Sequence, residues 1–274
     1  MDEIKQELID GKTVLFLGMG VFENLTCKDG SKLPYDSDSF VLALNNGRAM
    51  SPRLMYEYTR AAMSLEQRKG REYLVAMTNH IYTSKEYGFA KAYELVQALK
   101  PKYIIDTNLD ESICKIYADE PHFMITGVSR VMGGYDRYVI YRFDVEKKEY
   151  IRVDKSELDD TQPIIFKPMG CVIPEKNFIV SDADFVDWLT EAMGGYAIPP
   201  FLKEYRKDKK YLFLGVDFTR DTYRMVANEM TIDLQSGYIV TAPKEYTKKE
   251  SQFAQKHKLV FIEKDCDSFV EELL

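Results

Sequence analysis

The sequence predicts a doubly wound α/β fold with a mostly parallel central sheet. Short apolar segments without charge, such as Val14–Leu17 and Tyr211–Leu214, are typical of fully buried strands. They alternate along the chain with segments of helical periodicity, which favours helices packed on both faces of a parallel sheet. Because no linker or long internal repeat interrupts the 274 residues, we expect a single domain spanning 1–274.

The composition argues against three features: a nucleic-acid partner, a membrane span and a sequence-local zinc site. A formal net charge of -7 with interspersed signs argues against nucleic acid as the main partner. No apolar run approaches the ~20 residues that a membrane span needs, and Met1–Lys5 lacks the pattern of a signal peptide, so we expect a cytoplasmic protein without membrane contact. Cys27, Cys114, Cys171 and Cys266 lack Cys-x-x-Cys spacing, which excludes a sequence-local zinc site. We expect no bound metal.

The first fifty residues contain one clear strand. Residues 2–10 have the apolar spacing of a short amphipathic helix that leads into a strand at 14–17. Residues 23–50 are rich in Asp, Asn, Gly and Ser, which predicts an irregular loop. Inside it, 40–44 is an apolar segment whose periodicity does not decide between helix and strand.

A helical block follows and interrupts the alternation of strands and helices. Ser51-Pro52 is a helix start, with Ser at the N-cap and Pro at the first helical position. Apolar spacing continues this helix to about Lys69, and two more helices are predicted at 71–82 and 88–99. We expect the block from about 51 to 99 to form a small helical module over one edge of the sheet.

The rest of the chain returns to short strands. Buried strands are predicted at 103–106, 122–125, 163–167, 178–180, 211–214, 237–240 and 259–262. Alternating segments at 137–143 and 150–153, joined by a charged turn, predict a β-hairpin insertion at about 135–153. Ser181 and Asp184 have the spacing of a capping box at the start of a further helix.

Polar residues and glycines gather where four of these strands end. The first strand ends in Gly18-Met19-Gly20, where a side chain would keep the backbone from approaching a ligand. A helix beginning just after this turn would offer its N-terminus to a phosphate. The other three strand ends are Thr107–Asp110, Pro168–Gly170 and Gly215–Asp221. In doubly wound folds ligands bind at the carboxyl ends of the strands, so we expect these segments to line one site.

These segments carry a family resemblance. FLGMGV, then YIIDTNLD, then PIIFKPMG leading to IVSDADFVDWL, and then YLFLGVDFTRD follow one another in the order and spacing of the SIR2-like family. The chain looks most similar to SIR2-like proteins of bacteria and archaea that are encoded among nitrogen-fixation genes. The resemblance implies a Rossmann-like domain that binds NAD, with a smaller module over it. It also implies one of two activities, removal of acyl groups from lysine or hydrolysis of NAD.

The resemblance also implies roles for particular residues. The turn Gly18–Val21, which includes Met19 and Gly20, is expected to approach the pyrophosphate. Asn108 and Asp110 match the polar pair near the ribose next to nicotinamide, and are the candidate catalytic residues. The cofactor-binding residues implied at the other strand ends are Met169, Gly170, Gly215, Asp217, Thr219 and Asp221. Helix capping or a first-turn carboxylate accounts equally well for Asn108, Asp110 and Asp221.

The departures from the family bear on catalysis. Active members carry His-Gly where this chain has Met169-Gly170, and that His acts as a general base. A thioether has no titratable proton, and loss of a general base typically costs ~10²- to 10⁴-fold in rate. Of the other histidines, only His80 is a candidate to replace it. Asp217, where the family has a small hydroxyl residue, would repel a pyrophosphate, and the zinc ribbon of the lysine deacylases is absent.

Three functions remain open from the sequence. We favour a module that binds a nucleotide, NAD or ADP-ribose, and is catalytically weak or inactive, as in a sensor or accessory protein. The second is an enzyme that hydrolyses NAD with Asn108 and water. The third is an interaction protein with a vestigial cleft and an aromatic binding surface. A protein partner or a homo-oligomer is compatible with each.

Overall fold

The computed structural model describes all residues, 1–274, and its centre is one mostly parallel sheet. The strands are β1 (Thr13–Leu17), β2 (Tyr103–Asp106), β3 (Phe123–Gly127), β4 (Tyr138–Asp144), β5 (Glu149–Val153), β6 (Ile164–Lys167), β7 (Gly170–Cys171), β8 (Asn177–Phe178), β9 (Lys210–Leu214), β10 (Ser236–Thr241) and β11 (Leu259–Glu263). Nine of them form one sheet in the order β11-β10-β9-β1-β2-β6-β3-β4-β5, and β7 pairs only with β8. The predicted doubly wound α/β class is confirmed.

The order of the strands reverses beside β1. β1 pairs in parallel with β2 on one side and with β9 on the other. The chain first builds the half of the sheet that contains β2, β6 and β3, and only later returns to build β9, β10 and β11. Helices that leave β1 and β9 therefore diverge to opposite sides, and ligands of doubly wound folds bind at such a switch point. Here it lies at the carboxyl ends of β1 and β9.

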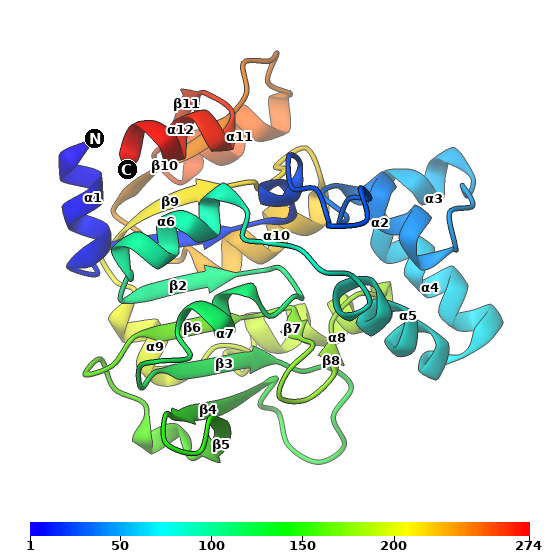
Figure 1. Cartoon of the computed structure of the whole chain (residues 1–274), viewed down its shortest axis with the longest axis horizontal. Coiled ribbons are helices and arrows are strands. Elements are labelled where there is room, and N and C mark those ends of the chain that lie inside the picture. The colour runs from blue at the N-terminus through cyan, green and yellow to red at the C-terminus, as the bar shows by residue number, and fades with distance from the viewer.

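Helices cover both faces of the sheet. They are α1 (Asp2–Ile9), α2 (Ser37–Leu44), α3 (Pro52–Tyr56), α4 (Tyr58–Lys69), α5 (Arg71–Thr83), α6 (Lys91–Leu99), α7 (Ser112–Ile116), α8 (Asp182–Met193), α9 (Pro200–Tyr205), α10 (Asp221–Met230), α11 (Lys248–Lys256) and α12 (Cys266–Leu273), with 3-10 turns η1 (Met19–Phe22) and η2 (Lys155–Glu157). In Figure 1, α6 and α7 cross the near face, and α9 and α10 lie behind the sheet. None of these helices has the length and apolar character needed to cross a bilayer.

The predicted hairpin is present and enlarges the sheet. β4 pairs antiparallel with both β3 and β5 and continues the parallel part beyond β3. Most β4 side chains are buried, whereas β5 forms the partly exposed edge of the sheet. The alternating pattern at 137–143 and 150–153 therefore marks a pair of strands at a sheet edge.

The helical module differs from the prediction in its bounds. Residues 37–44, predicted as part of an irregular loop, form α2, whose N-terminus is capped by the Asp36 carboxylate at 2.8 Å from the Ser39 amide. The helix predicted from Pro52 to Lys69 is broken at Glu57, which adopts an extended backbone between α3 and α4. α6 packs on α7 and α12 over the sheet instead of joining the module. The module is therefore α2 to α5, residues 37–83, and not 51–99.

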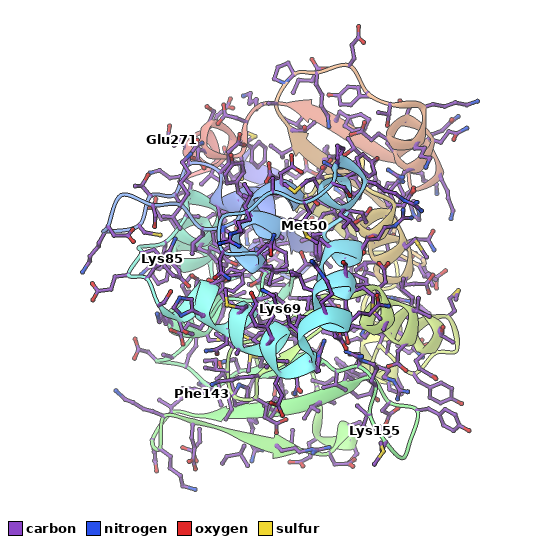
Figure 2. The ribbon with its side chains drawn as sticks, turned by 90° about the vertical axis from the view of Figure 1, so that its right-hand side faces the viewer. Met50, Lys69, Lys85, Phe143, Lys155 and Glu271 are labelled. Carbon is purple, nitrogen blue, oxygen red and sulfur yellow. The ribbon has the colours of Figure 1, made fainter.

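The module stands beyond the carboxyl ends of the strands (Figure 1). Figure 2, which views the molecule from that side, shows its helices in front, with Lys69 at the end of α4 and Met50 in the connection between α2 and α3. α4 packs against α8, and α5 contacts β8. The guanidinium of Arg220, in the loop after β9, lies over the Tyr56 ring at 4.1 Å and donates to the Tyr56 carbonyl at 2.6 Å. The module is thus attached to the same edge at which the predicted site residues lie.

Candidate functional site

The glycines at the ends of β1 and β9 lie against each other. The Gly20 amide donates to the Gly215 carbonyl at 2.8 Å. A Cβ on Gly215, whose φ is +67°, would lie 2.3 Å from the Val21 nitrogen, and one on Gly18 would lie 2.5 Å from the Gly215 carbonyl oxygen. Close packing of two backbones thus explains these glycines without a ligand. The structure brings together two motifs that lie almost 200 residues apart in the sequence.

The segment after the first glycine turn is short. A helix beginning just after this turn would have offered its N-terminus to a phosphate, but η1 is a single 3-10 turn of four residues, too short for a substantial helix dipole. The Gly20 and Val21 amides already donate to the carbonyls of Gly215 and Gly18. Of the predicted turn Gly18–Val21, the Met19 amide is the one whose N–H donates to no backbone acceptor.

Asn108 lies at the end of β2 and is bound to the end of β1. Its amide nitrogen donates to Asp106 Oδ1 at 3.0 Å. Its carboxamide Nδ2 donates to the Tyr93 hydroxyl at 3.1 Å and to the Gly18 carbonyl at 3.3 Å. Both Nδ2 protons are therefore engaged, whereas Oδ1 accepts no hydrogen bond from the protein. The residue as a whole is only 3% exposed.

Asp110 is fully buried and lies two residues before the start of α7. Its Oδ2 accepts from the Ser112 amide at 2.9 Å, at the N-terminus of α7, and its Oδ1 accepts from the Tyr93 hydroxyl at 3.3 Å. The capping interpretation that the sequence left open thus accounts for one of its two carboxylate oxygens. The other joins a buried polar cluster.

An ion pair forms the centre of this cluster. Lys167 Nζ, at the end of β6, lies 2.7 Å from Asp106 Oδ2, at the end of β2, and both side chains are fully buried. Burial raises the pKa of Asp106, an effect that the positive charge of Lys167 opposes. The nearby Asp106 charge in turn raises the pKa of Lys167 against the effect of burial, so the ammonium keeps its proton. A lysine whose pKa is raised in this way is a poor general base near neutral pH.

Sequence reasoning missed Tyr93, Asp106 and Lys167. Asp106 and Lys167 each end an otherwise apolar strand, and a charged residue buried at such a position needs a partner. That signal was available in the sequence. Tyr93 gave no such signal in the sequence, because a tyrosine in an amphipathic helix is most often a packing residue.

Met169 and Gly170 belong to a small hairpin formed by β7 and β8. Met169 is 4% exposed, and its carbonyl accepts from the Ile179 amide at 2.9 Å. Gly170 has a φ of +90°, and a Cβ there would lie 1.8 Å from the Asn177 carbonyl oxygen. This backbone contact explains the glycine. The thioether of Met169 lies in the apolar core, where it offers no proton-transfer group.

Asp217 and Thr219 form a compact turn after β9. Asp217 Oδ1 accepts from the Thr219 amide at 3.0 Å and from the Thr219 hydroxyl, and Oδ2 lies 3.2 Å from Arg220 Nε. The repulsion that we expected between Asp217 and a pyrophosphate is therefore offset by Arg220. Asp221 is exposed and pairs with Lys249 Nζ at 2.9 Å and with Arg224. These partners favour its interpretation as a first-turn carboxylate of α10.

The histidines lie apart from this cluster. His122 Nδ1–H donates to the Glu120 carbonyl at 2.9 Å, and Nε2 accepts from the Tyr150 hydroxyl at 2.9 Å. Burial lowers the pKa of His122 to about 4 and that of His257 to about 4. Neither forms a hydrogen bond with Asn108 or with the Asp106–Lys167 pair.

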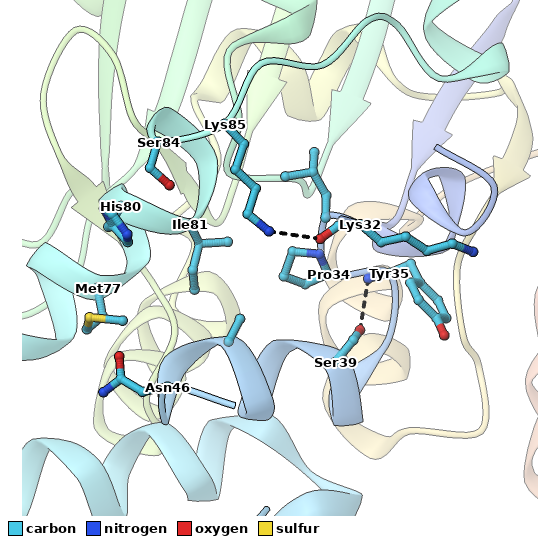
Figure 3. A pocket seen from close by; sticks show the side chains of 12 residues that line it. Lys32, Pro34, Tyr35, Ser39, Asn46, Met77, His80, Ile81, Ser84 and Lys85 are labelled. Carbon is cyan, nitrogen blue, oxygen red and sulfur yellow. Dashed lines mark hydrogen bonds between the residues drawn. The ribbon is translucent and has the colours of Figure 1, made fainter. Parts of the chain in front are cut away.

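His80 lines a separate pocket of about 260 Å³ between α5 and the segment that leads into α2. Figure 3 shows it near Met77 and Asn46, while Lys85 reaches across to the Lys32 carbonyl at 3.4 Å. Neither Asn108 nor Met169 lines this pocket. The candidate to replace the missing base therefore belongs to a different depression.

Two of the cysteines lie near the buried cluster. Cys171 is fully buried and its Sγ donates to the Asp110 carbonyl at 3.2 Å, while the buried Cys114 contacts Met124 Sδ at 3.5 Å. No group of three or more His, Cys, Asp or Glu side chains is arranged to hold a metal ion.

Comparison with known proteins identifies the family. The SIR2-like domain family matches residues 102–262, which is more than half of the chain. The matched segment runs from β2 to β11 and includes Asn108, Asp110, Met169, Gly215 and Asp221, but neither β1 nor the module. No curated protein matches the chain. The fold, the order of the strand-end motifs and this match together place the chain in the SIR2-like family.

Proposed function

We propose that this protein binds a nucleotide, NAD or ADP-ribose, at the edge where β1, β2, β6 and β9 end, and that it cleaves NAD weakly or not at all. The family to which it belongs is NAD-related and its members generally bind NAD. The switch point of the sheet, beside β1 and β9, lies at the same edge.

The observation that carries the proposal is the hydrogen bonding of the Asn108 carboxamide. Its carboxamide is fixed by two hydrogen bonds from Nδ2, and Oδ1 has no donor within the protein. Oδ1 is not one of the fully enclosed side-chain atoms that lack a partner, so a donor from outside the protein can reach it. A ribose hydroxyl or a water molecule supplies that donor.

Weak turnover follows from the groups around Asn108. Met169 has no proton to transfer, and Lys167 stays protonated beside Asp106. The carboxylates of Asp106 and Asp110 are engaged with protein donors. Binding without turnover suits a sensor or accessory protein.

Two measurements test this function. Calorimetric titration with NAD and with ADP-ribose should give binding heat for the wild type and strongly reduced heat for Asn108→Ala. Asn79→Ala is the matched control, because Asn79 bonds only within α5, to Thr83. Absence of heat with both nucleotides would reject nucleotide binding and leave the interaction protein.

The second measurement is chromatography for nicotinamide after incubation with NAD. We expect trace release at most, abolished in Asn108→Ala. Robust release that depends on Asn108 would instead establish the second candidate, an NAD-hydrolysing enzyme. This second candidate is supported by Asn108 Oδ1, which has no hydrogen bond within the protein and is a suitable acceptor for an attacking water.

A further inference from the structure

We propose that Tyr93 is the positioning residue of Asn108: its hydroxyl, anchored by Asp106 and Lys167, orients the carboxamide so that Oδ1 faces the nucleotide. This inference rests on the nucleotide-binding function proposed above. Tyr93 itself lies on α6, outside every segment that the sequence marked as part of the site.

Tyr93 occupies the centre of the buried cluster. Its side chain is fully buried, and its ring stacks against Phe22 of η1 at 5.9 Å between centroids. Its hydroxyl lies 3.1 Å from Asp106 Oδ2 and 3.3 Å from Asp110 Oδ1, and accepts from Asn108 Nδ2 at 3.1 Å. One hydroxyl group therefore contacts both ends of the segment 106–110 and the candidate ligand-binding amide within it.

Counting protons fixes the orientation of the amide. A phenol has one proton, and burial together with the charges of Asp106 and Asp110 raises the pKa of Tyr93, so this proton stays in place. The carboxylates can only accept hydrogen bonds. The Tyr93 O–H therefore donates to a carboxylate, and a lone pair of the hydroxyl oxygen faces Asn108. Only the NH₂ side of the carboxamide can meet that lone pair. The flipped carboxamide would place Oδ1 against another acceptor.

Lys167 fixes the Asp106 carboxylate to which Tyr93 is bonded. Its ammonium lies 2.7 Å from Asp106 Oδ2, and the Asn108 amide donates to Asp106 Oδ1 at 3.0 Å. Both oxygens of the Asp106 carboxylate are thus held by groups other than Tyr93. Networks of this kind in a low-dielectric interior restrict the groups that they contain more than isolated bonds do.

The role has a specific consequence. Without the hydroxyl, Nδ2 keeps only the longer bond to the Gly18 carbonyl, at 3.3 Å, and the carboxamide can rotate. Nucleotide affinity then falls although Tyr93 acts only through Asn108. Tyr93→Phe removes the hydroxyl and preserves the ring that packs on Phe22.

The experiment is a double-mutant cycle on the full chain, with ADP-ribose as the probe and calorimetry as the readout. We expect Tyr93→Phe to weaken binding about tenfold, the loss typical of one hydrogen bond. In the Asn108→Ala background, Tyr93→Phe should cause no further loss, because the residue that it orients is absent. Equal losses in both backgrounds would show a general structural role and overturn the proposal.

Tyr211→Phe is the matched control. Tyr211 is also fully buried, and its hydroxyl makes one bond, to the Met230 carbonyl at 3.0 Å, without contact with the cluster. Its replacement should leave affinity for ADP-ribose unchanged. A loss equal to that of Tyr93→Phe would attribute the effect to any lost buried hydroxyl and overturn the proposal.

A second readout needs no ligand. The side-chain NH₂ signals of Asn108, identified by their loss in Asn108→Ala, should exchange with water at least about tenfold faster in Tyr93→Phe, since one protecting bond is lost. Unchanged exchange overturns the positioning role. If the wild type gives no heat with ADP-ribose, the proposed function fails, and amide exchange by itself decides whether Tyr93 holds Asn108.

Discussion

The family resemblance implies that Met169 stands where active members carry the histidine that activates a ribose hydroxyl or a water. Met169 is 4% exposed and packs in the apolar core. The chain has the α/β fold of the family, and the resemblance predicts that it lacks one proton-transfer group at this position. If that group limits turnover, restoring it should have a measurable effect.

Met169→His should raise nicotinamide release from NAD by at least about tenfold, a conservative share of the effect of a general base. A buried imidazole at this position remains neutral near pH 7, as a base must be. Met169→Leu, which keeps an apolar side chain of similar volume, should leave the rate unchanged. A folded Met169→His protein with wild-type rates would show that the histidine is not what limits turnover.

The junction of β1 and β9 is the feature that organises the molecule at the scale of its elements. Gly18 and Gly215 allow the two strand ends to approach until their backbones touch. The same two ends define the switch point. The glycines are therefore needed for the fold at the very place where a nucleotide is expected.

Gly215→Ala should destabilise the protein far more than Gly30→Ala. Both glycines have positive φ, +67° and +81°, so both alanines carry the backbone strain of about 1–2 kcal/mol. Only at Gly215 does the new Cβ meet another backbone, whereas Gly30 has nothing within 4 Å. Denaturant unfolding of both variants measures the difference. Equal losses would mean that the junction relaxes freely.

The ion pair between β2 and β6 should contribute to stability because neither partner can be solvated alone. Lys167→Met leaves Asp106 buried without its counter-charge and should cost about 3–5 kcal/mol in the free energy of unfolding. Lys28→Met, which removes the fully exposed partner of Glu86, should change stability little. Similar midpoints for Lys167→Met and wild type in urea would refute the structural importance of the buried pair.

At the scale of the whole molecule, buried histidines make stability depend on pH. The pKa of His122 is lowered by burial from 6.5 to about 4. The unfolded chain therefore binds more protons between these pH values, and stability is lost as pH falls through that window. Protonated Nε2 would also face a hydroxyl that now donates to it.

The wild type should lose about 3 kcal/mol more of its free energy of unfolding between pH 6.5 and pH 4 than His122→Asn does. Asn keeps a donor for the Glu120 carbonyl but does not titrate. Urea unfolding at several pH values measures both curves. Parallel curves of the free energy of unfolding against pH would show that His122 does not contribute to the loss of stability in acid.

Local pattern determined much of this fold. Uncharged apolar runs such as Val14–Leu17 and Tyr211–Leu214 predict buried strands, because burial on both faces of a sheet requires apolar residues throughout. The Ser181 and Asp184 capping box and the hairpin at 135–153 were equally readable, since their partners lie within a few residues. α2 was not predicted although its capping box, formed by Asp36 and Ser39, is a local signal. The break at Glu57 was not predicted because the apolar spacing continues through it.

By itself, the sequence determined the α/β class, the family resemblance, the strand-end positions of Asn108 and Asp110, and the absence of the histidine at Met169. Only the tertiary structure decided that Gly18 meets Gly215, that Lys167 neutralises Asp106 and that Tyr93 holds Asn108. The physical reason is sequence separation. Strands and caps depend on neighbours along the chain, whereas these contacts join segments that become neighbours only when the sheet assembles.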